Sequence, residues 1–184
     1  ILRSCGAGIA AVDDLLLNNE RIFCAIRPPG HHAETTRANG FCFINNIAVA
    51  ARYLQNKYKI NKVAIIDFDV HHGNGTQEIF YNDNSIAYAS THEFPLFPGT
   101  GTEDETGVGN IFNAPIKPGT EGAEFLEIFD SKINIENFRI NDTDKLLDEK
   151  NVHNLYDGPK FADLEDDLQD GMIMFLEEQG IDSN

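Results

Sequence analysis

The chain has 184 residues, a formal net charge of −16 and a sequence pI of about 4.5, which argues against direct nucleic-acid binding through a basic face. Its length fits one domain, or one domain with a small appendage, and 41% hydrophobic residues suffice for a globular core. No apolar run approaches the roughly 20 residues of a membrane span, so we expect no transmembrane segment.

Helical and strand-like patterns alternate along the first 133 residues. Helices are predicted from apolar residues at three- and four-residue steps, and strands from short apolar runs that end at turn residues. In chain order, we predict a helix over 4–18, a strand over 23–26, a helix over 43–58, a strand over 62–68, a helix over 73–82, a strand over 85–90, a loop over 95–110, a short strand over 113–117 and a helix over 122–133. This alternation predicts α/β architecture with a parallel sheet.

The composition changes after residue 133. Residues 134–184 hold 14 acidic and 4 basic residues, a net charge of −10, which leaves −6 for residues 1–133. From Phe161 to Leu176 the apolar residues recur at helical steps, and Gly180 is a natural stop. We therefore predict one domain over 1–133 and an acidic, mainly helical appendage over 134–184.

Acidic and histidine side chains follow the predicted strand over 62–68. Alternate residues of a strand point the same way, so Asp69 and His71 can face one point just past its end. A carboxylate oxygen and an imidazole nitrogen suit a divalent metal such as zinc. Catalytic zinc takes about three protein ligands and keeps one open position. This segment supplies two.

Two further histidines, His31 and His32, lie in a Pro/Gly loop after the predicted strand over 23–26. Active sites of open α/β sheets gather outside the carboxyl ends of the strands, so both histidine clusters are expected to meet there. Tandem histidines beside a metal suit a general base and a general acid that activate water. The alternative is a pair of surface histidines, which the Asp67–Gly75 segment in the same chain makes the weaker interpretation.

Four motifs, in order and with matching spacing, resemble the zinc-dependent histone deacetylase family. They are Arg27–Ala33, Gly40–Cys42, Asp67–Gly75 and Phe97–Gly101. The first motif and the residues before it are more similar to class II and bacterial amidohydrolase members. The resemblance covers residues 1 to about 133. It implies an incomplete parallel-sheet fold of the arginase/deacetylase type and hydrolysis of an acetyl-lysine amide to acetate and a free amine.

The resemblance also implies roles for individual residues. Asp69 and His71 would bind zinc, while His31 and His32 would activate the zinc-bound water and protonate the leaving amine. Asp67 would orient one of those histidines. The implied substrate channel consists of Gly40, Phe41 and Phe97. The implied site for a structural monovalent cation, such as potassium, consists of Asp67, Asp69, His71 and Ser90 with nearby backbone carbonyls.

Each assignment has a structural alternative. Asp67 can simply cap the following turn, and Phe97 can belong to the core. Cys42 is expected to be a small buried hydrophobic residue rather than a nucleophile. We expect the remaining histidines to be packed, capping or surface residues without a ligand partner: His72, His92 and His153.

The chain departs from the deacetylase pattern after Ile133. The family's second zinc-binding aspartate, in a Gly-x-Asp context, and its tyrosine in a glycine-rich loop have no counterpart there, and Tyr156 lies in a different context. The tail over 150–184 resembles instead the C-terminal part of the mitochondrial matrix acidic glycoprotein family. That family forms acidic ring-shaped trimers without established enzyme chemistry. The alternative is an unrelated acidic amphipathic helix.

These observations predict a zinc-dependent deacetylase with impaired or no activity in this chain. The alternative is a non-catalytic acidic interaction protein that retains a relic deacetylase fragment. The expected substrates are an acetylated lysine protein or a small acetylated amine, and the acidic tail is a candidate for binding a protein partner. We expect no binding of nucleic acid or membranes.

The expected compartment is intracellular. The chain has three cysteines without paired spacing and no signal peptide, which favours reduced thiols inside a cell. The deacetylase resemblance favours the nucleus or cytoplasm, and the tail resemblance gives the mitochondrion as an alternative. Because the first residue is Ile1 rather than Met, we expect that the chain can be a fragment without its targeting signals.

Overall fold

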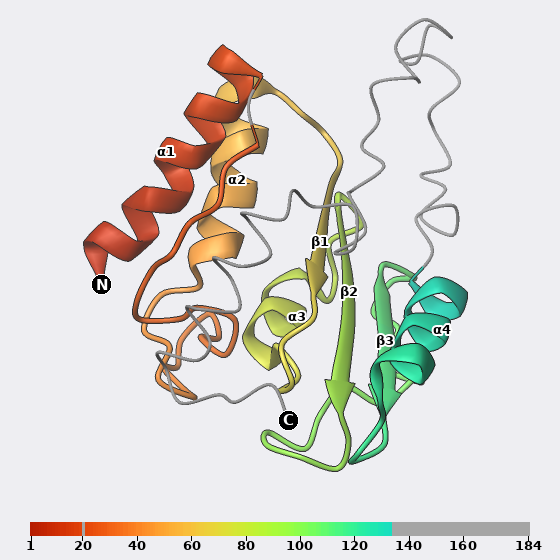
Figure 1. The fold of residues 1–184 in the computed structure, drawn as a ribbon. Helices are drawn as coiled ribbons and strands as arrows, with labels where there is room; N and C mark the ends of the chain where they lie inside the picture. The colour runs from red at the N-terminus through yellow and green to blue at the C-terminus, as the bar shows by residue number, and fades with distance from the viewer. Residues whose placement is uncertain (20, 134–184) are drawn as a thin grey trace, which may run out of the picture. The chain divides into compact units, whose positions relative to one another are not determined.

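The computed structural model describes residues 1–19 and 21–133. Three parallel strands form one sheet in the order β1-β2-β3, with helices packed around it (Figure 1). The described elements are α1 (Leu2–Asn18), α2 (Asn46–Tyr58), β1 (Val63–Asp67), α3 (Asn74–Phe80), β2 (Ile86–Glu93), β3 (Ile111–Ile116) and α4 (Gly122–Lys132).

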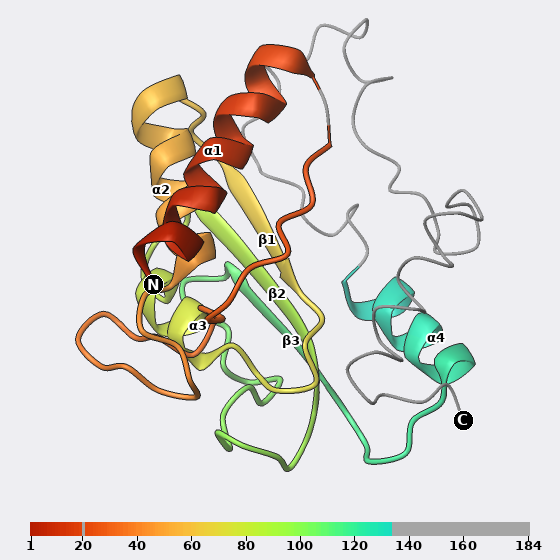
Figure 2. The ribbon, with the colours of Figure 1, turned by 60° about the vertical axis from the view of Figure 1, so that its left-hand side comes forward.

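The sheet register gives the core two separate halves. Ile65, Tyr88 and Ile111 are neighbours across the three strands, and they pack with Ala48, Ala51 and Phe80 of α2 and α3. The next residue of each strand points to the opposite face, because side chains alternate along a strand. There Ala89 packs with residues of α4 and with Ile133. Figure 2 accordingly shows α2 and α3 on one side of the sheet and α4 on the other.

Helices α1 and α2 hold the loop that leads to His31. The Ser4 hydroxyl donates to the Pro28 carbonyl oxygen at 2.9 Å, and the Asn46 amide donates to both Ser4 Oγ and Pro28 O. A Cβ atom at Gly30 would lie 2.5 Å from the Asn46 nitrogen, so only glycine fits this approach. The first histidine loop is therefore fixed to the start of α2 by buried polar contacts.

The structure confirms the predicted α/β architecture and most predicted elements. The helices over 4–18, 43–58, 73–82 and 122–133 all form, as do the strands near 62–68, 85–90 and 113–117, with boundaries shifted by up to three residues. Residues 95–110 lie between β2 and β3 without helix or strand, as predicted. The predicted tail helix and the appendage over 134–184 lie outside the described residues.

The prediction of a strand over Phe23–Ile26 was wrong. Its apolar composition fits a strand, but a strand also needs a hydrogen-bonded neighbour, and no described strand pairs with this segment. Instead, Cys24 and Ile26 line a cavity against α1 and α2, and the Cys24 thiol contacts the Ala7 carbonyl oxygen. Phe23 points the other way and is 84% exposed. Alternate residues of this extended segment thus face the helices because the segment packs on them, without pairing in the sheet.

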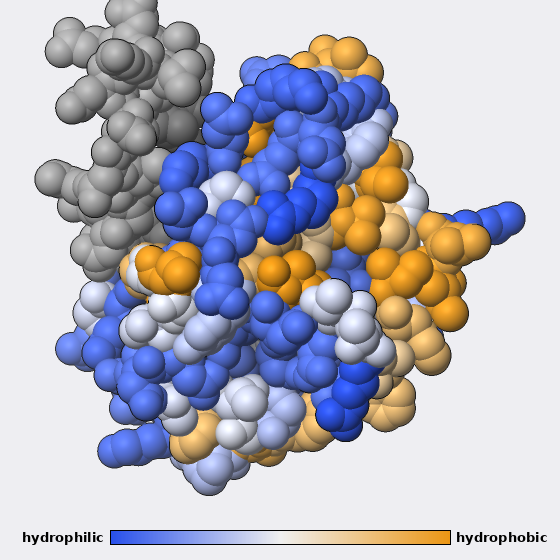
Figure 3. Space-filling model, turned by 180° about the vertical axis from the view of Figure 1, so that it is seen from behind, coloured by the Kyte–Doolittle hydropathy of each residue, from blue (hydrophilic) through white to orange (hydrophobic). Residues whose placement is uncertain are grey.

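A groove of about 630 Å³ lies along β1, and its apolar lining includes Ile26, Ile47, Ile65 and Phe68. Seen from behind, the described part shows hydrophobic residues concentrated toward one side of this face (Figure 3). Several large apolar side chains are exposed, among them Phe68 at 75%. Among the described residues, no helix combines the length and the hydropathy needed to cross a bilayer.

Truncation of Phe80 should destabilise the domain strongly. Phe80 is fully buried in the core between the sheet and the helices α2 and α3, so Phe80→Ala should lower the free energy of unfolding by about 3–5 kcal/mol. Urea unfolding followed by circular dichroism measures the change. The matched control is Phe23→Ala, where the ring is exposed and the expected change is within about 0.5 kcal/mol. Equal effects of the two variants would contradict this packing.

Candidate functional site

The site begins where β1 ends, in two consecutive turns made by aspartates. The Asp67 carboxylate accepts a hydrogen bond from the Asp69 backbone N–H at 3.2 Å, and Asp69 accepts from the His71 N–H at 2.8 Å. Aspartate side chains commonly bond to the backbone two residues on and so stabilise turns. These turns bring Asp67, Asp69 and His71 to one side of the strand end. Asp67 therefore caps a turn, and it also contacts the first histidine.

His31 is hydrogen-bonded to the carboxylate of Asp67. The imidazole Nδ1 donates to Asp67 Oδ2 at 3.0 Å, and both side chains are largely buried. Burial disfavours the imidazolium, but the hydrogen bond and the negative charge of Asp67 outweigh it and raise the pKa of His31. Burial likewise acts on Asp67, where the bond from His31 prevails and lowers the pKa. The pair thus favours a protonated His31 beside an ionised Asp67.

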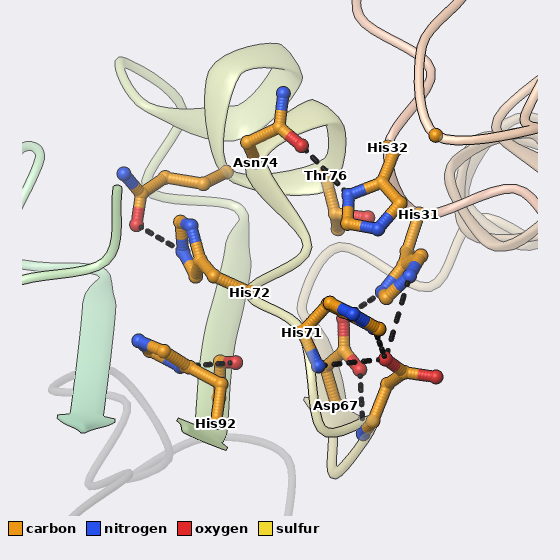
Figure 4. Close-up of polar contacts among 12 residues, drawn as sticks. His31, His32, Asp67, His71, His72, Asn74, Thr76 and His92 are labelled. Carbon is orange, nitrogen blue, oxygen red and sulfur yellow. Dashed lines mark hydrogen bonds and ion pairs between the residues drawn. The ribbon is translucent and has the colours of Figure 1, made fainter. Parts of the chain in front are cut away.

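His32 has a neutral partner instead. Its Nδ1 lies 2.8 Å from Asn74 Oδ1 (Figure 4). The Asn74 amide nitrogen donates to Glu34 at 2.7 Å. Because the amide orientation is fixed by Glu34, His32 Nδ1 must carry the hydrogen and Nε2 keeps its lone pair. Burial first, and then the charge of the neighbouring His31, lower the pKa of His32. The pKa values of the two adjacent histidines are therefore shifted in opposite directions, which suits an acid and base pair.

Asp69 and His71 have the spacing of two ligands of one metal ion. Asp69 Oδ1 and His71 Nδ1 lie 3.1 Å apart, and both side chains are accessible to solvent. Ligand bonds of about 2.0–2.1 Å at a tetrahedral centre place neighbouring donors at such a separation. Among the described residues, no group of three His, Cys, Asp or Glu side chains is arranged to hold a metal. The described donors thus fit two ligands of a zinc ion.

The ring of Phe97 lies beside His32 and His71. The Phe97 ring centroid lies 5.1 Å from that of His32 and 6.3 Å from that of His71, with near-perpendicular planes. Phe41 is 88% exposed, and its φ of 62° lies in the left-handed region, which residues other than glycine seldom adopt. A Cβ atom at Gly40 would lie 2.2 Å from the His32 ring, so glycine allows this loop to pack on the histidine. Gly40 and Phe97 thus lie beside His32, while Phe41 follows Gly40 with its ring exposed to solvent.

Sequence reasoning missed two residues of this site. Tyr88 is fully buried and donates from its hydroxyl to Asp67 Oδ2 at 3.0 Å, and Asn74 fixes His32. Asn74 lies three residues after His71, at the start of α3, a position from which it can reach back over the strand end. Tyr88 lies in β2 two residues before Ser90, so strand alternation puts both on one face. The spacing of Asn74 from His71 and that of Tyr88 from Ser90 are the sequence signals that could have identified these two residues.

The remaining residues singled out in the sequence lie around the site or outside the described residues. Ser90 is the register partner of Asp67 across the sheet, and its hydroxyl bonds to His92 at 2.9 Å. Cys42 is buried, as predicted, and burial raises the pKa of its thiol. His72 is buried and points away from the histidine pair (Figure 4). His153 lies outside the described residues.

Two family models match the chain. Residues 1–139 match the Histone deacetylase domain, and residues 103–184 match the Mitochondrial glycoprotein family, so the two matches overlap at 103–139. Both resemblances seen in the motifs are thereby confirmed. The second match begins well before the segment that suggested it.

Curated relatives and a solved structure are similar over the first part of the chain. A probable deacetylase of Archaeoglobus fulgidus is 42% identical over 137 residues, which is 72% of this chain and 38% of that protein. The chloroplastic histone deacetylase 10 of Oryza sativa subsp. japonica is 47% identical, covering 66% of this chain and 29% of that protein. The crystal structure of the HDA15 HD domain matches with a TM-score of 0.58 and 42% identity, covering 61% of this chain and 33% of that one. The chain thus spans less than half the length of these relatives.

The hydrogen bond from His32 to Asn74 should be visible in nitrogen NMR. In the metal-free chain, long-range proton–nitrogen correlations should show neutral His32 with its hydrogen on Nδ1, since Asn74 Oδ1 accepts it. Asn74→Ala should shift His32 toward a mixture of tautomers. Asn84→Ala, which changes an exposed loop residue, serves as the control. A hydrogen on Nε2 in the unmodified chain would be incompatible with this network.

Proposed function

The chain belongs to the histone deacetylase domain family, and from this premise we propose that it is a deacylase whose site hydrolyses the amide bond of an acetylated amine. The observation that carries the proposal is the histidine pair. His31 bonds to a carboxylate and His32 to an amide, so that one ring favours the cation and the other the free base. This arrangement lies directly beside Asp69 and His71, and it suits attack of water on a carbonyl group.

His32 is proposed as the general base. Its Nε2 takes a proton from water as the water oxygen bonds to the carbonyl carbon, and the same proton passes to the amine nitrogen when the C–N bond breaks. His31 keeps its proton, since Asp67 stabilises the cation, and its charge favours the negative tetrahedral centre. The products are acetate and the free amine.

Zinc is the proposed cofactor, with Asp69 and His71 as two of its ligands. When bound, zinc would polarise the carbonyl and acidify the attacking water. Asp67, Asp69, His71 and Ser90, with nearby carbonyls, are proposed to hold a structural potassium ion. Two ligands bind zinc less tightly than three. The family tyrosine that would polarise the substrate carbonyl also has no counterpart in the sequence, and loss of such a donor commonly costs about 10²–10³ in rate. We therefore propose weak hydrolysis by the 184 residues themselves.

The proposed substrates carry an acetyl group on a linear amine. Phe97 exposes aromatic surface beside His32, and Phe41 exposes its ring on the loop of Gly40, which packs on His32; such rings pack well on a methylene chain. An acetylated lysine side chain and a small acetylated polyamine share this shape. Both are proposed as substrate classes, with the protein lysine as the leading one.

A second candidate function is a non-catalytic interaction protein. The Mitochondrial glycoprotein match over 103–184 and the net charge of −10 on residues 134–184 support a protein partner for this acidic part. We propose an intracellular location. The deacetylase family favours the nucleus or cytoplasm, while the chloroplastic relative and the second family match support an organelle as the alternative.

Zinc binding should depend on Asp69. Changing a residue that only hydrogen-bonds to a metal ligand commonly costs roughly 10-fold in metal affinity. Asp69→Asn removes one of the two proposed ligands and should therefore raise the zinc Kd by more than that factor. Competition with a chromogenic chelator measures the Kd. Asp104→Asn, an exposed acidic residue of the 95–110 loop, is the matched control. Unchanged affinity in Asp69→Asn would remove this residue from the proposed site.

Hydrolysis should depend on His32. With added zinc, His32→Ala should lower kcat/KM on an acetyl-lysine peptide by about 10²–10⁴, the usual contribution of a general base. Asp104→Asn is again the control, and acetylputrescine assayed in parallel separates the two substrate classes. Robust turnover that survives His32→Ala would refute the site assignment. A wild-type chain without turnover on either substrate would favour the interaction protein.

A further inference from the structure

We propose that a cluster of buried and half-buried polar side chains positions Phe97 beside the histidine pair. The cluster consists of His72, Gln77, His92 and Glu105, and we call it the anchor cluster. The inference deepens the proposed function, since Phe97 is part of the proposed channel. It assigns to the anchor cluster a positioning role, without contact to substrate or metal.

The anchor cluster holds three consecutive residues that follow Phe97. Thr100 Oγ1 bonds to His72 Nδ1 at 2.7 Å, and His92 Nε2 donates to the Gly101 carbonyl oxygen at 2.9 Å. Glu105 then accepts from the backbone N–H groups of Gly101 and Thr102 at 2.9 and 3.0 Å. Each of these residues thus has at least one buried or half-buried partner, and the segment cannot shift without breaking several bonds.

The donors and acceptors form one consistent network. The Gln77 amide nitrogen donates to Glu105 Oε2 at 2.5 Å, which turns Gln77 Oε1 toward His72 Nε2 and Asn113 Nδ2. His72 therefore donates from Nε2 and accepts at Nδ1 from the Thr100 hydroxyl. Glu105 is the only carboxylate of the cluster and accepts hydrogen bonds at both oxygens. Its removal leaves several buried donors without an acceptor, which is costly.

Close packing adds to the hydrogen bonds. The rings of His72 and His92 lie 4.6 Å apart, and the backbone of Gly101 lies against both of them. A Cβ atom at Gly101 would lie 2.4 Å from His92 Nε2, and its φ of +92° is one that side chains rarely adopt. Gly101 therefore lets the segment sit directly on the two histidine rings.

Phe97 itself has little support of its own. Its side chain is 46% exposed, and its ring contacts in the site are the edges of His32 and His71. Such aromatic pairs contribute only about 0.5–1.5 kcal/mol beyond their buried area. Residues 100–102, three to five positions along the chain, are bonded to His72, to His92 of β2 and to Glu105, which Gln77 of α3 holds in turn. The position of the Phe97 ring thus depends on the anchor cluster.

Fluorine NMR of the full chain tests this dependence. para-Fluorophenylalanine is placed at position 97, or at the fully buried Phe80 as a reporter of the fold. In Glu105→Ala, the resonance at position 97 should move at least half-way toward its value in the urea-unfolded chain, while that at position 80 stays. Glu103→Ala, which removes an exposed carboxylate of the same loop, should move neither resonance.

A milder variant covers the case in which Glu105→Ala unfolds the chain and moves both resonances. Thr100→Val keeps the shape of the side chain but removes the bond to His72, and it should move only the resonance at position 97. An unchanged resonance at position 97 in Thr100→Val and in a folded Glu105→Ala overturns the proposal. Zinc titration of the same samples is independent of this readout. Absent zinc binding would count against the proposed function, not against the anchor cluster.

Discussion

The bond between His31 Nδ1 and Asp67 Oδ2 is the contact on which the site depends. It joins two segments 36 residues apart, the loop fixed by α1 and α2 and the end of β1. The loop carries the histidine pair, and the strand end carries Asp69 and His71. Tyr88 adds a second donor to the same Asp67 oxygen from the neighbouring strand. One largely buried carboxylate therefore joins the loop of His31 and His32 to the strand end that carries Asp69 and His71.

The difference between the two histidines follows from their partners. Both rings lose solvation, which alone would lower the pKa of each. His31 recovers its charge because a carboxylate accepts from it, whereas an uncharged amide accepts from His32. Once His31 is charged, its proximity disfavours a second charge on His32. A carboxylate in place of the Asn74 amide would reduce this asymmetry, so the neutral partner helps to keep the pKa of His32 low.

Much of this could be predicted from short-range sequence patterns. The strand over 63–67 follows from an apolar run. Asp69 and His71 do lie together, as expected from strand alternation, but β1 ends at Asp67 and two aspartate turns bring them there. The Phe23–Ile26 segment was misjudged because propensity does not say whether a neighbouring strand is present. Tyr88 and Asn74 were missed for a different reason. Their roles depend on side chains 21 and 42 residues away, and such pairings appear only when the sheet and α3 are in place.

The two His-His dipeptides of the chain place their rings differently. His31 and His32 have tilted rings 4.0 Å apart and lie on the same side of the fold, so that their charges interact. His71 and His72 diverge, and the divergence gives them separate surroundings (Figure 4). His71 is solvent-accessible and faces Asp69, while His72 is buried against His92 and the Phe97–Gly101 segment. The strand end thus turns one histidine outward to the proposed zinc site and buries the next against the segment that follows Phe97.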